Sequence, residues 1–333
     1  MRHHGWASTV RTAAGLEAYL CHREDHHERR HPLIDAPKKG PGRLIAIIAV
    51  IVVVLAAVGI GIAVSRGGSS DDTVRIGVVG ASDPYWSTFA DAAADEGIDV
   101  EIVDFGSYEQ PNPALTEGEL DLNQFQHIVY LAQYDVAADA DLVPIGSTAI
   151  YPLPLYSEKY TDVSDFQKGD TIAVPDDASN LARSLLVLQS NGLIELKDGG
   201  DIFSGINDID EDASTVTVTP VAADLAATSL PDFDGAIINN DYATKAGLSV
   251  DDVIAQDDPN DPAALPYVNV FAARAGDADD ETYKKLVEIY QDTQSVTDGV
   301  VENSGGTAVT VKVPVADLQS SLEDTKKLVE QNG

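Results

Sequence analysis

Beyond residue 73, short runs of apolar and β-branched residues alternate with longer stretches in which apolar residues recur every three or four positions. The short runs predict buried strands, and the longer stretches predict amphipathic helices. We expect strands at Val74–Val79, Val100–Phe105, Leu142–Ile145, Thr171–Val174, Val216–Val218 and Gly235–Ile238, and helices at Trp86–Glu96, Asn123–Ala137, Ser179–Asn191 and Ala223–Leu230. Strand–helix alternation of this kind predicts an α/β fold with helices covering the sheets.

The predicted strands fall into two groups along the chain, which indicates two lobes. A crossing near Tyr151–Tyr156 leads from the first group to the second, and a return near Pro266–Ala273 leads back. We therefore expect lobe 1 to comprise residues 74–151 and 266–333, and lobe 2 to comprise residues 152–265. A cleft between two lobes is a natural place to enclose a small ligand.

A continuous hydrophobic run precedes this body. Leu44–Ser65 contains no charged residue over 22 positions, and as a helix it would be roughly 33 Å long, enough for the core of a bilayer. Lys38, Lys39 and Arg43 precede the run and an acidic stretch follows it. The positive-inside bias then places residues 1–43 in the cytoplasm and the large acidic body outside.

The hydrophobic run has two interpretations. Ala63 and Ser65 are small residues suited to the cleavage site of a secretory signal. The run is longer than a typical signal core, which favours an uncleaved single-pass transmembrane anchor over residues 44–65, followed by a polar linker over residues 66–73.

Charge is spread unevenly along the chain. The whole chain has 21 Lys and Arg against 55 Asp and Glu, for a net charge of −34, and its first 66 residues contain nine and five of these. The remaining residues therefore carry 12 basic and 50 acidic side chains, a net charge of −38. So acidic a body repels nucleic acid and anionic membrane surfaces, which excludes a nucleic-acid partner.

The residues that most enzymes need are scarce in the body. The only cysteine is Cys21, and six of the seven histidines lie in residues 1–43, which leaves His127 as the body's single histidine. The six could form a metal-binding tail, but no ligand spacing repeats, which favours a solvated arm. No nucleophile elbow, phosphate-binding loop, dinucleotide fingerprint or zinc-protease motif is present. We expect no enzyme activity, no catalytic residue and no cofactor.

One acidic cluster has the outline of a calcium loop. Asp208, Asp210 and Asp212 follow a D-x-D-x-D pattern, but position six is Ala213 instead of Gly and position twelve is Thr219 instead of Glu. A calcium loop needs the glycine for its turn and the glutamate as a bidentate ligand. We therefore predict a solvated loop and no metal site.

Aromatic residues gather in the segment Phe125–Tyr130. On a helix His127 and Tyr130 are three positions apart and share a face, so with Phe125 nearby they could wall an apolar pocket with two polar tips. Alternatively, Phe125 and Tyr130 are simply core residues.

A polar segment, Pro175–Arg183, follows the predicted strand at Thr171–Val174. Asp177 or Ser179 is placed to cap a helix, on which Asn180 and Arg183 are three apart and point the same way. Arginine near a helix start suits a bidentate clamp on a carboxylate. A surface arginine is the alternative, although the body contains only three arginines.

A second polar segment, Ile238–Ala243, follows the predicted strand at Gly235–Ile238. Asn239 and Asp241 could accept hydrogen bonds from an ammonium group. Alternatively, they cap a helix, where Asn and Asp are favoured.

Together these segments resemble the methionine-binding lipoproteins of ABC importers, the NlpA-type family. The resemblance rests on four elements in order: Gly118–Asp121 with Phe125–His127, Pro175–Leu185, Ile238–Ala243 and Pro266–Asn269. It implies a two-lobed type 2 periplasmic-binding-protein fold. It also implies that Tyr108, Phe125, His127 and Tyr130 form an aromatic wall around a thioether side chain, that Asn180 and Arg183 hold the ligand carboxylate, and that Asn239 and Asp241 hold the ammonium.

The function implied by the resemblance is an extracytoplasmic solute-binding subunit that delivers methionine to an ABC permease and its ATPase. The alternatives are a methionine-containing dipeptide or another apolar amino acid as the ligand, or a membrane-anchored sensor that keeps the fold but not the transport role. The sequence departs from the family at Asn240-Asp241, where Gly-Asn is usual, and at Asp177 and Ser184. No lipobox cysteine follows the hydrophobic run, which makes the membrane helix the expected tether.

Overall fold

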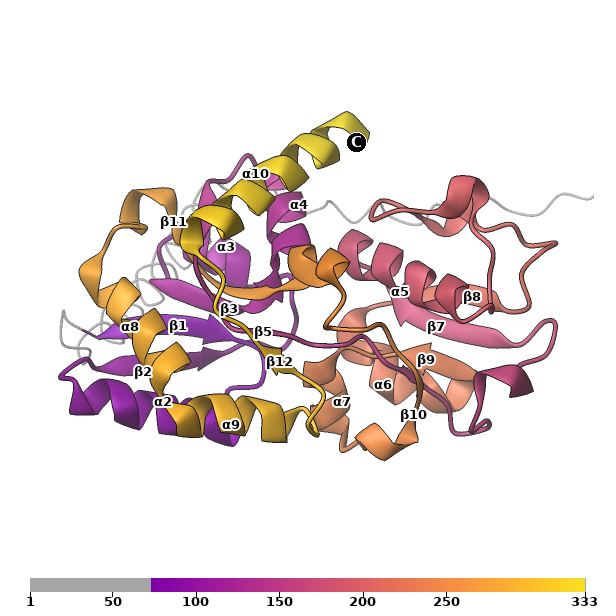
Figure 1. Ribbon diagram of the computed structural model, residues 1–333, viewed down its shortest axis with the longest axis horizontal. Coiled ribbons are helices and arrows are strands. Elements are labelled where there is room, and N and C mark those ends of the chain that lie inside the picture. The colour runs from indigo at the N-terminus through magenta and orange to yellow at the C-terminus, as the bar shows by residue number, and fades with distance from the viewer. Residues whose placement is uncertain (1–72, 333) are drawn as a thin grey trace, which may run out of the picture. The chain divides into compact units, whose positions relative to one another are not determined.

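The computed structural model describes residues 73–332, which are built on two five-stranded sheets (Figure 1). The first sheet has the strand order β2-β1-β3-β11-β4, and the second has the order β10-β6-β9-β7-β8. The first sheet comprises β1 (Val74–Val78), β2 (Val100–Asp104), β3 (Leu122–His127), β4 (Leu142–Ser147) and β11 (Asn269–Arg274). The second comprises β6 (Leu155–Tyr156), β7 (Thr171–Pro175), β8 (Thr217–Val221), β9 (Gly235–Ile237) and β10 (Val253–Ala255). A separate antiparallel pair joins β5 (Ala149–Ile150) to β12 (Val309–Thr310).

Both sheets are mixed in the same way. In the first sheet β1 is parallel to β2 and β3, while β11 runs antiparallel between β3 and β4. In the second sheet β7 is parallel to β8 and β9, while β6 runs antiparallel to β9. Parallel strands that are neighbours in a sheet end at the same edge, so the segments that follow them are brought together.

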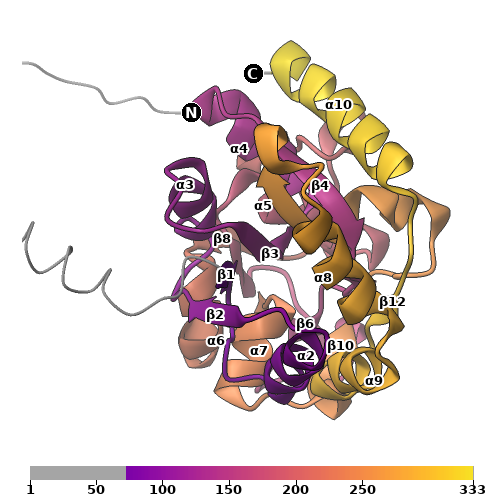
Figure 2. The ribbon, with the colours of Figure 1, turned by 90° about the vertical axis from the view of Figure 1, so that its left-hand side faces the viewer.

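Helices cover both faces of each sheet (Figures 1 and 2). On the first sheet, α2, α8 and α9 lie on one face, and α3, α4 and α10 lie on the other. On the second sheet, α5 lies on one face, and α6 and α7 lie on the other. The bounds are α2 Pro84–Asp95, α3 Pro111–Thr116, α4 Ile128–Ala138, α5 Ala178–Ser190, α6 Ala223–Ser229, α7 Asn240–Ala246, α8 Glu281–Asp292, α9 Gln294–Asn303 and α10 Val315–Asn332.

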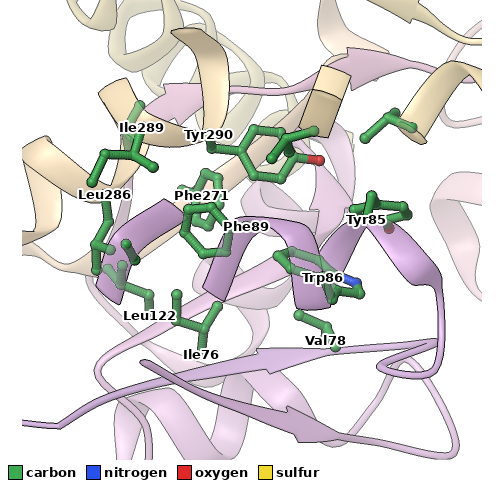
Figure 3. Packing of buried hydrophobic residues seen from close by; sticks show 14 of the residues in the cluster. Ile76, Val78, Tyr85, Trp86, Phe89, Leu122, Phe271, Leu286, Ile289 and Tyr290 are labelled. Atoms are coloured by element: carbon green, nitrogen blue, oxygen red, sulfur yellow. The ribbon is translucent and has the colours of Figure 1, made fainter. Parts of the chain in front are cut away.

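Aromatic residues dominate the core beneath α2 and α8 (Figure 3). Helix α2 begins with Pro84 at its first turn, where the missing N–H costs no hydrogen bond. Its helical spacing turns Trp86 and Phe89 onto the sheet, where both are almost fully buried. The ring of Tyr290 on α8 meets Phe89 edge-on at 5.5 Å and Phe271 on β11 at 5.1 Å between centroids. This cluster ties the C-terminal helices to the first strands of the chain.

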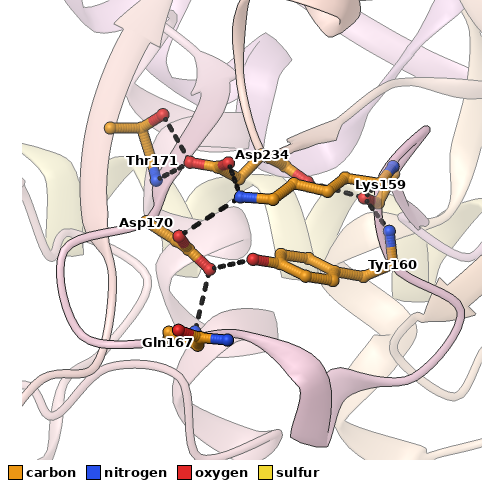
Figure 4. A network of polar contacts seen from close by, with 7 residues as sticks. Lys159, Tyr160, Gln167, Asp170, Thr171 and Asp234 are labelled. Carbon is orange, nitrogen blue, oxygen red and sulfur yellow. Dashed lines mark hydrogen bonds and ion pairs between the residues drawn. The ribbon is translucent and has the colours of Figure 1, made fainter.

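A polar network fixes the amino ends of β7 and β9 (Figure 4). Asp234, just before β9, accepts from the Thr171 N–H at 2.7 Å and from Lys159 Nζ at 2.6 Å. Asp170, just before β7, accepts from Tyr160 Oη at 2.8 Å. The hydrogen bond from Lys159 and those from Thr171 hold the pKa of Asp234 below its usual range. The network lies at the amino ends of these strands, whereas the polar segments singled out from the sequence follow their carboxyl ends.

Most of the predicted elements are confirmed, but the helix expected over Asn123–Ala137 is wrong in its first part. Residues Leu122–His127 form β3, and α4 begins only at Ile128. All six residues of β3 are buried, because helices cover both faces of a central strand. The polar ones hydrogen-bond inside the protein, as Asn123 does to Asn112 at 2.8 Å. The strand therefore shows neither alternation nor an apolar run.

The predicted arm, membrane anchor and almost all of the linker, residues 1–72, lie outside the described residues. Across residues 73–332 no helix has the length and apolar character needed to cross a bilayer. The second group of strands, β6 to β10, does lie in one sheet, and the lobe boundaries at residues 151/152 and 265/266 stay a prediction.

Candidate ligand-binding site

A cavity of about 50 Å³ lies where the carboxyl ends of the parallel strands of both sheets meet. A cavity that holds one water molecule has a volume of about 10–15 Å³ by the same definition. This cavity can therefore hold a group of several atoms from a small ligand. All eight residues singled out from the sequence line it: Tyr108, Phe125, His127, Tyr130, Asn180, Arg183, Asn239 and Asp241. They come from segments that are far apart in the chain. Each residue lies near the carboxyl end of β3 or in the segment that follows β2, β3, β7 or β9.

The aromatic wall comes from the first sheet. Tyr108 follows β2, Phe125 lies in β3 and Tyr130 lies in the first turn of α4. Their ring centroids are 5.7–6.2 Å apart, within the range of aromatic contacts. Phe125 is only 8% exposed, so it serves the core and the cavity together. The two interpretations of this residue are therefore not exclusive.

His127 ends β3 and caps α4. Its Nδ1 accepts from the Tyr130 N–H at 3.1 Å, which places the ring hydrogen on Nε2 and makes that atom a donor toward Asn180 Oδ1 at 3.4 Å. Burial, together with the positive charge of Arg183, lowers the pKa of His127 to about 3. The imidazole is therefore neutral at physiological pH. His127 and Tyr130 meet through this cap, and the expected shared helix face is wrong.

Asn180 and Arg183 lie on α5, whose first turn is capped by Asp177, as predicted. The Arg183 side chain is 6% exposed. Its Nε donates to Asp257 Oδ2 at 2.7 Å and its Nη2 donates to the Tyr151 carbonyl at 2.7 Å. The guanidinium carbon lies 4.4 Å from the ring centroid of Tyr267. Arg183 is therefore a buried, fixed cation, and the alternative of a surface arginine is wrong.

Asn239 stands at the N-cap position of α7, but its side chain makes no capping hydrogen bond. Its Nδ2 donates instead to Asn180 Oδ1 at 3.1 Å. Its Oδ1 is buried and has no hydrogen-bond partner among the described residues. A buried, unsatisfied acceptor costs free energy unless a ligand donor satisfies it.

Asp241 brings a negative charge to the cavity. It lies in the first turn of α7, and its Oδ2 accepts from Tyr108 Oη at 2.7 Å, a hydrogen bond that links the two sheets. Burial raises the pKa of Asp241 to about 7; the Tyr108 hydroxyl opposes this effect and the charge of Asp83 adds to it. Among residues 73–332 no Lys, Arg or His side chain pairs with Asp241, and none contributes to this shift. An ammonium group would supply a cationic partner.

The structure adds residues that were not among the eight candidates. Tyr85, Gln124, Tyr151 and Asn269 also line the cavity. Asn269 belongs to the fourth matching element and opens β11, so its place after the return crossing was a usable signal. Tyr151 lies in the first crossing, and no local pattern distinguishes it from a core tyrosine.

The acidic loop interpreted as solvated shows local hydrogen bonding. Asp208 Oδ2 accepts from the Gly205 N–H, and Asp210 Oδ1 accepts from the N–H groups of Asp212 and Ala213. Within residues 73–332 no three His, Cys, Asp or Glu residues come together as a metal site.

Comparison with known proteins places the chain among binding proteins of this architecture. A family model described as NlpA lipoprotein matches residues 74–311. A relative in Pasteurella multocida, named a probable D-methionine-binding lipoprotein MetQ, is 37% identical over 237 residues, which cover 70% of this chain and 84% of the relative.

Solved structures share the fold. Protein PG110 from Staphylococcus aureus has a TM-score of 0.72 and 33% identity, covering 76% of this chain and 99% of its own. A nutrient binding protein from Burkholderia cenocepacia, solved bound to methionine, has a TM-score of 0.67 and 34% identity, covering 71% and 99%. The expected α/β fold of the periplasmic-binding-protein kind is therefore confirmed.

Proposed function

The chain belongs to the NlpA lipoprotein family, and from that premise we propose that it binds methionine in this cavity outside the cytoplasm and delivers it to the permease of an ABC importer. The observation that carries the proposal is the set of side chains that meet there. One cavity is lined by a buried guanidinium, by an aromatic wall and by a carboxyl group that pairs with no cation in the described part of the chain. These three groups complement the carboxylate, ammonium and thioether of a methionine zwitterion.

We assign the groups as follows. Arg183 holds the ligand carboxylate, because the guanidinium is fixed, buried and always charged. Asn180, whose Nδ2 donates to both Asp177 oxygens at 3.0 Å, is assigned to the same carboxylate by the family resemblance. Asp241 and the unsatisfied Oδ1 of Asn239 accept from the ammonium. Tyr108, Phe125, His127 and Tyr130 surround the side chain, where sulfur–aromatic contacts favour a thioether.

The two lobes of a type 2 arrangement would close around the ligand. The late, antiparallel β11 inserted between β3 and β4 supports this assignment. Hydrogen bonds already join segments of the two sheets across the cavity, among them those from Tyr108 to Asp241 and from His127 to Asn180. A ligand that bridges the same groups shifts the population toward the closed form. The closed form then docks on the permease, which works with an ATPase.

The tether is part of the proposal. The relatives are named lipoproteins, whereas this chain offers the hydrophobic run of residues 44–65 with Lys38, Lys39 and Arg43 on its cytoplasmic side. We assign this run as the membrane anchor that holds the body outside the cell. The mass of the membrane-extracted protein tests the assignment, because a cleaved or lipidated chain has a different mass from an intact one.

Calorimetric titration of methionine into residues 67–333 tests the ligand. Truncating one partner of a buried charge pair costs roughly 2–5 kcal/mol, so Arg183→Ala should weaken methionine binding by about 30-fold or more. Arg75→Ala is the matched control, because Arg75 pairs with Glu101 on the first sheet and does not line the cavity. Methionine affinity that is the same in Arg183→Ala and the wild type would refute the assignment.

A methionine-containing dipeptide is the second candidate, and a neighbouring cavity favours it. This cavity of about 230 Å³ shares Tyr108 and Tyr130 with the first and is also lined by Tyr134, Glu109 and Asp177. A residue attached to the methionine amino group could extend into it, past the shared tyrosines. Thermal-shift measurements with methionine and with methionine-containing dipeptides separate the two ligands, since the tighter one stabilises the folded state more.

A further inference from the structure

The guanidinium of Arg183 is held by residues that belong to both connections between the sheets. Tyr151, whose carbonyl accepts from Nη2, lies between β5 and β6 in the first connection. Tyr267, whose ring stacks on the guanidinium, ends the 3₁₀ helix Pro262–Tyr267 in the return connection. Arg183 itself lies on α5 of the second sheet. Its position therefore depends on segments outside its own helix.

Asp257 provides the only carboxylate among the partners of Arg183 in the described part of the chain. It follows β10, and its side chain is 27% exposed. Its Oδ2 accepts from Arg183 Nε at 2.7 Å, and its Oδ1 accepts from the Leu153 N–H at 2.7 Å. One carboxylate thus joins the arginine to the first connection through two short hydrogen bonds.

These contacts leave a defined set of donors for a ligand. A guanidinium has five N–H groups, and here one on Nε and one on Nη2 have protein acceptors. The three that remain are the two on Nη1 and one on Nη2, and one from each of these nitrogens forms the end of the fork. Asp257 does not line the cavity, whereas Arg183 does.

We propose that Asp257 is a positioning residue for ligand recognition: it fixes the rotation of the Arg183 guanidinium so that the end of the fork faces the ligand carboxylate. The inference rests on the proposed function and names a residue that touches Arg183 and not the cavity. Without Asp257, the Nε donor and the Leu153 N–H both lose their acceptor, and the guanidinium must be ordered at the moment of binding.

The charge of Asp257 opposes its positioning effect on ligand affinity. A carboxylate beside Arg183 partly neutralises it and lowers its attraction for a ligand carboxylate. If this effect dominated, removal of Asp257 would tighten binding. The geometry favours positioning, because Asp257 accepts at 2.7 Å from both Arg183 Nε and the Leu153 N–H and so holds the guanidinium in one rotation.

The test compares methionine with methioninol, which keeps the side chain and the ammonium but lacks the carboxylate. Thermal-shift titration up to tens of millimolar ligand measures even weak affinities. Asp257→Ala should weaken methionine roughly 10-fold or more, as expected for the loss of a hydrogen bond to a charged group, and leave methioninol unchanged. Asp258→Ala, which removes the same charge one residue away, should change neither.

A double-variant series adds a second, independent criterion. If Asp257 acts through Arg183, then adding Asp257→Ala to Arg183→Ala should cause no further loss of methionine affinity. Asp257→Asn keeps one acceptor oxygen and should fall between wild type and Asp257→Ala; it carries the same test if the alanine variant does not fold.

Three results overturn the inference while the proposed function stands: an equal loss for both ligands, unchanged methionine affinity, or tighter methionine binding by Asp257→Ala. Absence of methionine binding by the wild type removes the proposed function, and the inference with it.

Discussion

Asp241 should strengthen ligand binding but lower the free energy of unfolding of the ligand-free protein. The carboxyl group has an ordinary pKa of 3.8 and a pKa of about 7 in the folded protein, chiefly through burial. The folded state therefore holds a proton between these values that the unfolded state has released. The contribution of Asp241 to the free energy of unfolding is therefore greatest below pH 4, and it is lost as the pH rises through about 7.

The size of this penalty follows from the shift. About three pKa units at 1.36 kcal/mol each give roughly 4 kcal/mol above pH 7. Asp241 is half-buried rather than fully buried, so solvent screening reduces the penalty by about half, to about 2 kcal/mol. Asparagine does not titrate and can still accept from Tyr108. Asp241→Asn should therefore be more stable than wild type at pH 8 and equally stable at pH 4.

Ligand-free protein, unfolded by heat or urea between pH 4 and 8, provides the measurement. For a body of this size 2 kcal/mol corresponds to a rise in Tm of about 4–8 °C at pH 8. Asp251→Asn, at an exposed aspartate, is the control and should show no such rise. A Tm difference between Asp241→Asn and wild type that stays constant with pH, or a loss of stability at pH 8, would refute the reasoning.

Two further predictions follow from the same structure. Methionine affinity should fall by roughly 10- to 30-fold between pH 8 and 5.5, because protonation of Asp241 removes the charge that attracts the ligand ammonium, while His127, with a pKa of about 3, stays neutral. Calorimetric titration at each pH measures this affinity. A pH dependence unchanged in Asp241→Asn would contradict the assignment and identify Asp83, with a pKa raised to about 6, as the titrating group. Phe89→Ala should lower the free energy of unfolding by about 3–5 kcal/mol, because the ring is fully buried against Tyr290; urea unfolding tests it, and a loss below 1 kcal/mol would mean that the core refills the space.

The sequence supported the candidate site well because its residues follow strand ends. Asn180 and Arg183 come after β7, and Asn239 and Asp241 come after β9. Parallel neighbours end at one edge, so a correct prediction of the two strands already placed these residues near each other. Capping by Asp177 was equally local, because the side chain bonds within its own turn.

Other parts depended on contacts that no local pattern encodes. Strand β3 has buried polar residues, and Asn123, Gln124 and Gln126 each hydrogen-bond to a side chain outside the strand, Asn112 or Thr148. Asp257 lies in a run of acidic residues that looks like a solvated loop. Its partner Arg183 is 74 residues away, so the ion pair was invisible before the chain was folded.

By itself, the sequence determined the strand–helix alternation and the acidic character of the body, because both depend on residue type and short-range spacing. The eight candidate side chains were predicted from local patterns together with the family resemblance. The tertiary structure decided which of them meet and in what state. Burial in the cavity makes His127 a neutral donor and raises the pKa of Asp241, and the packing of distant segments brings Asp257 to Arg183. These properties arise from desolvation and from contacts between distant segments, which exist only once both sheets are packed together.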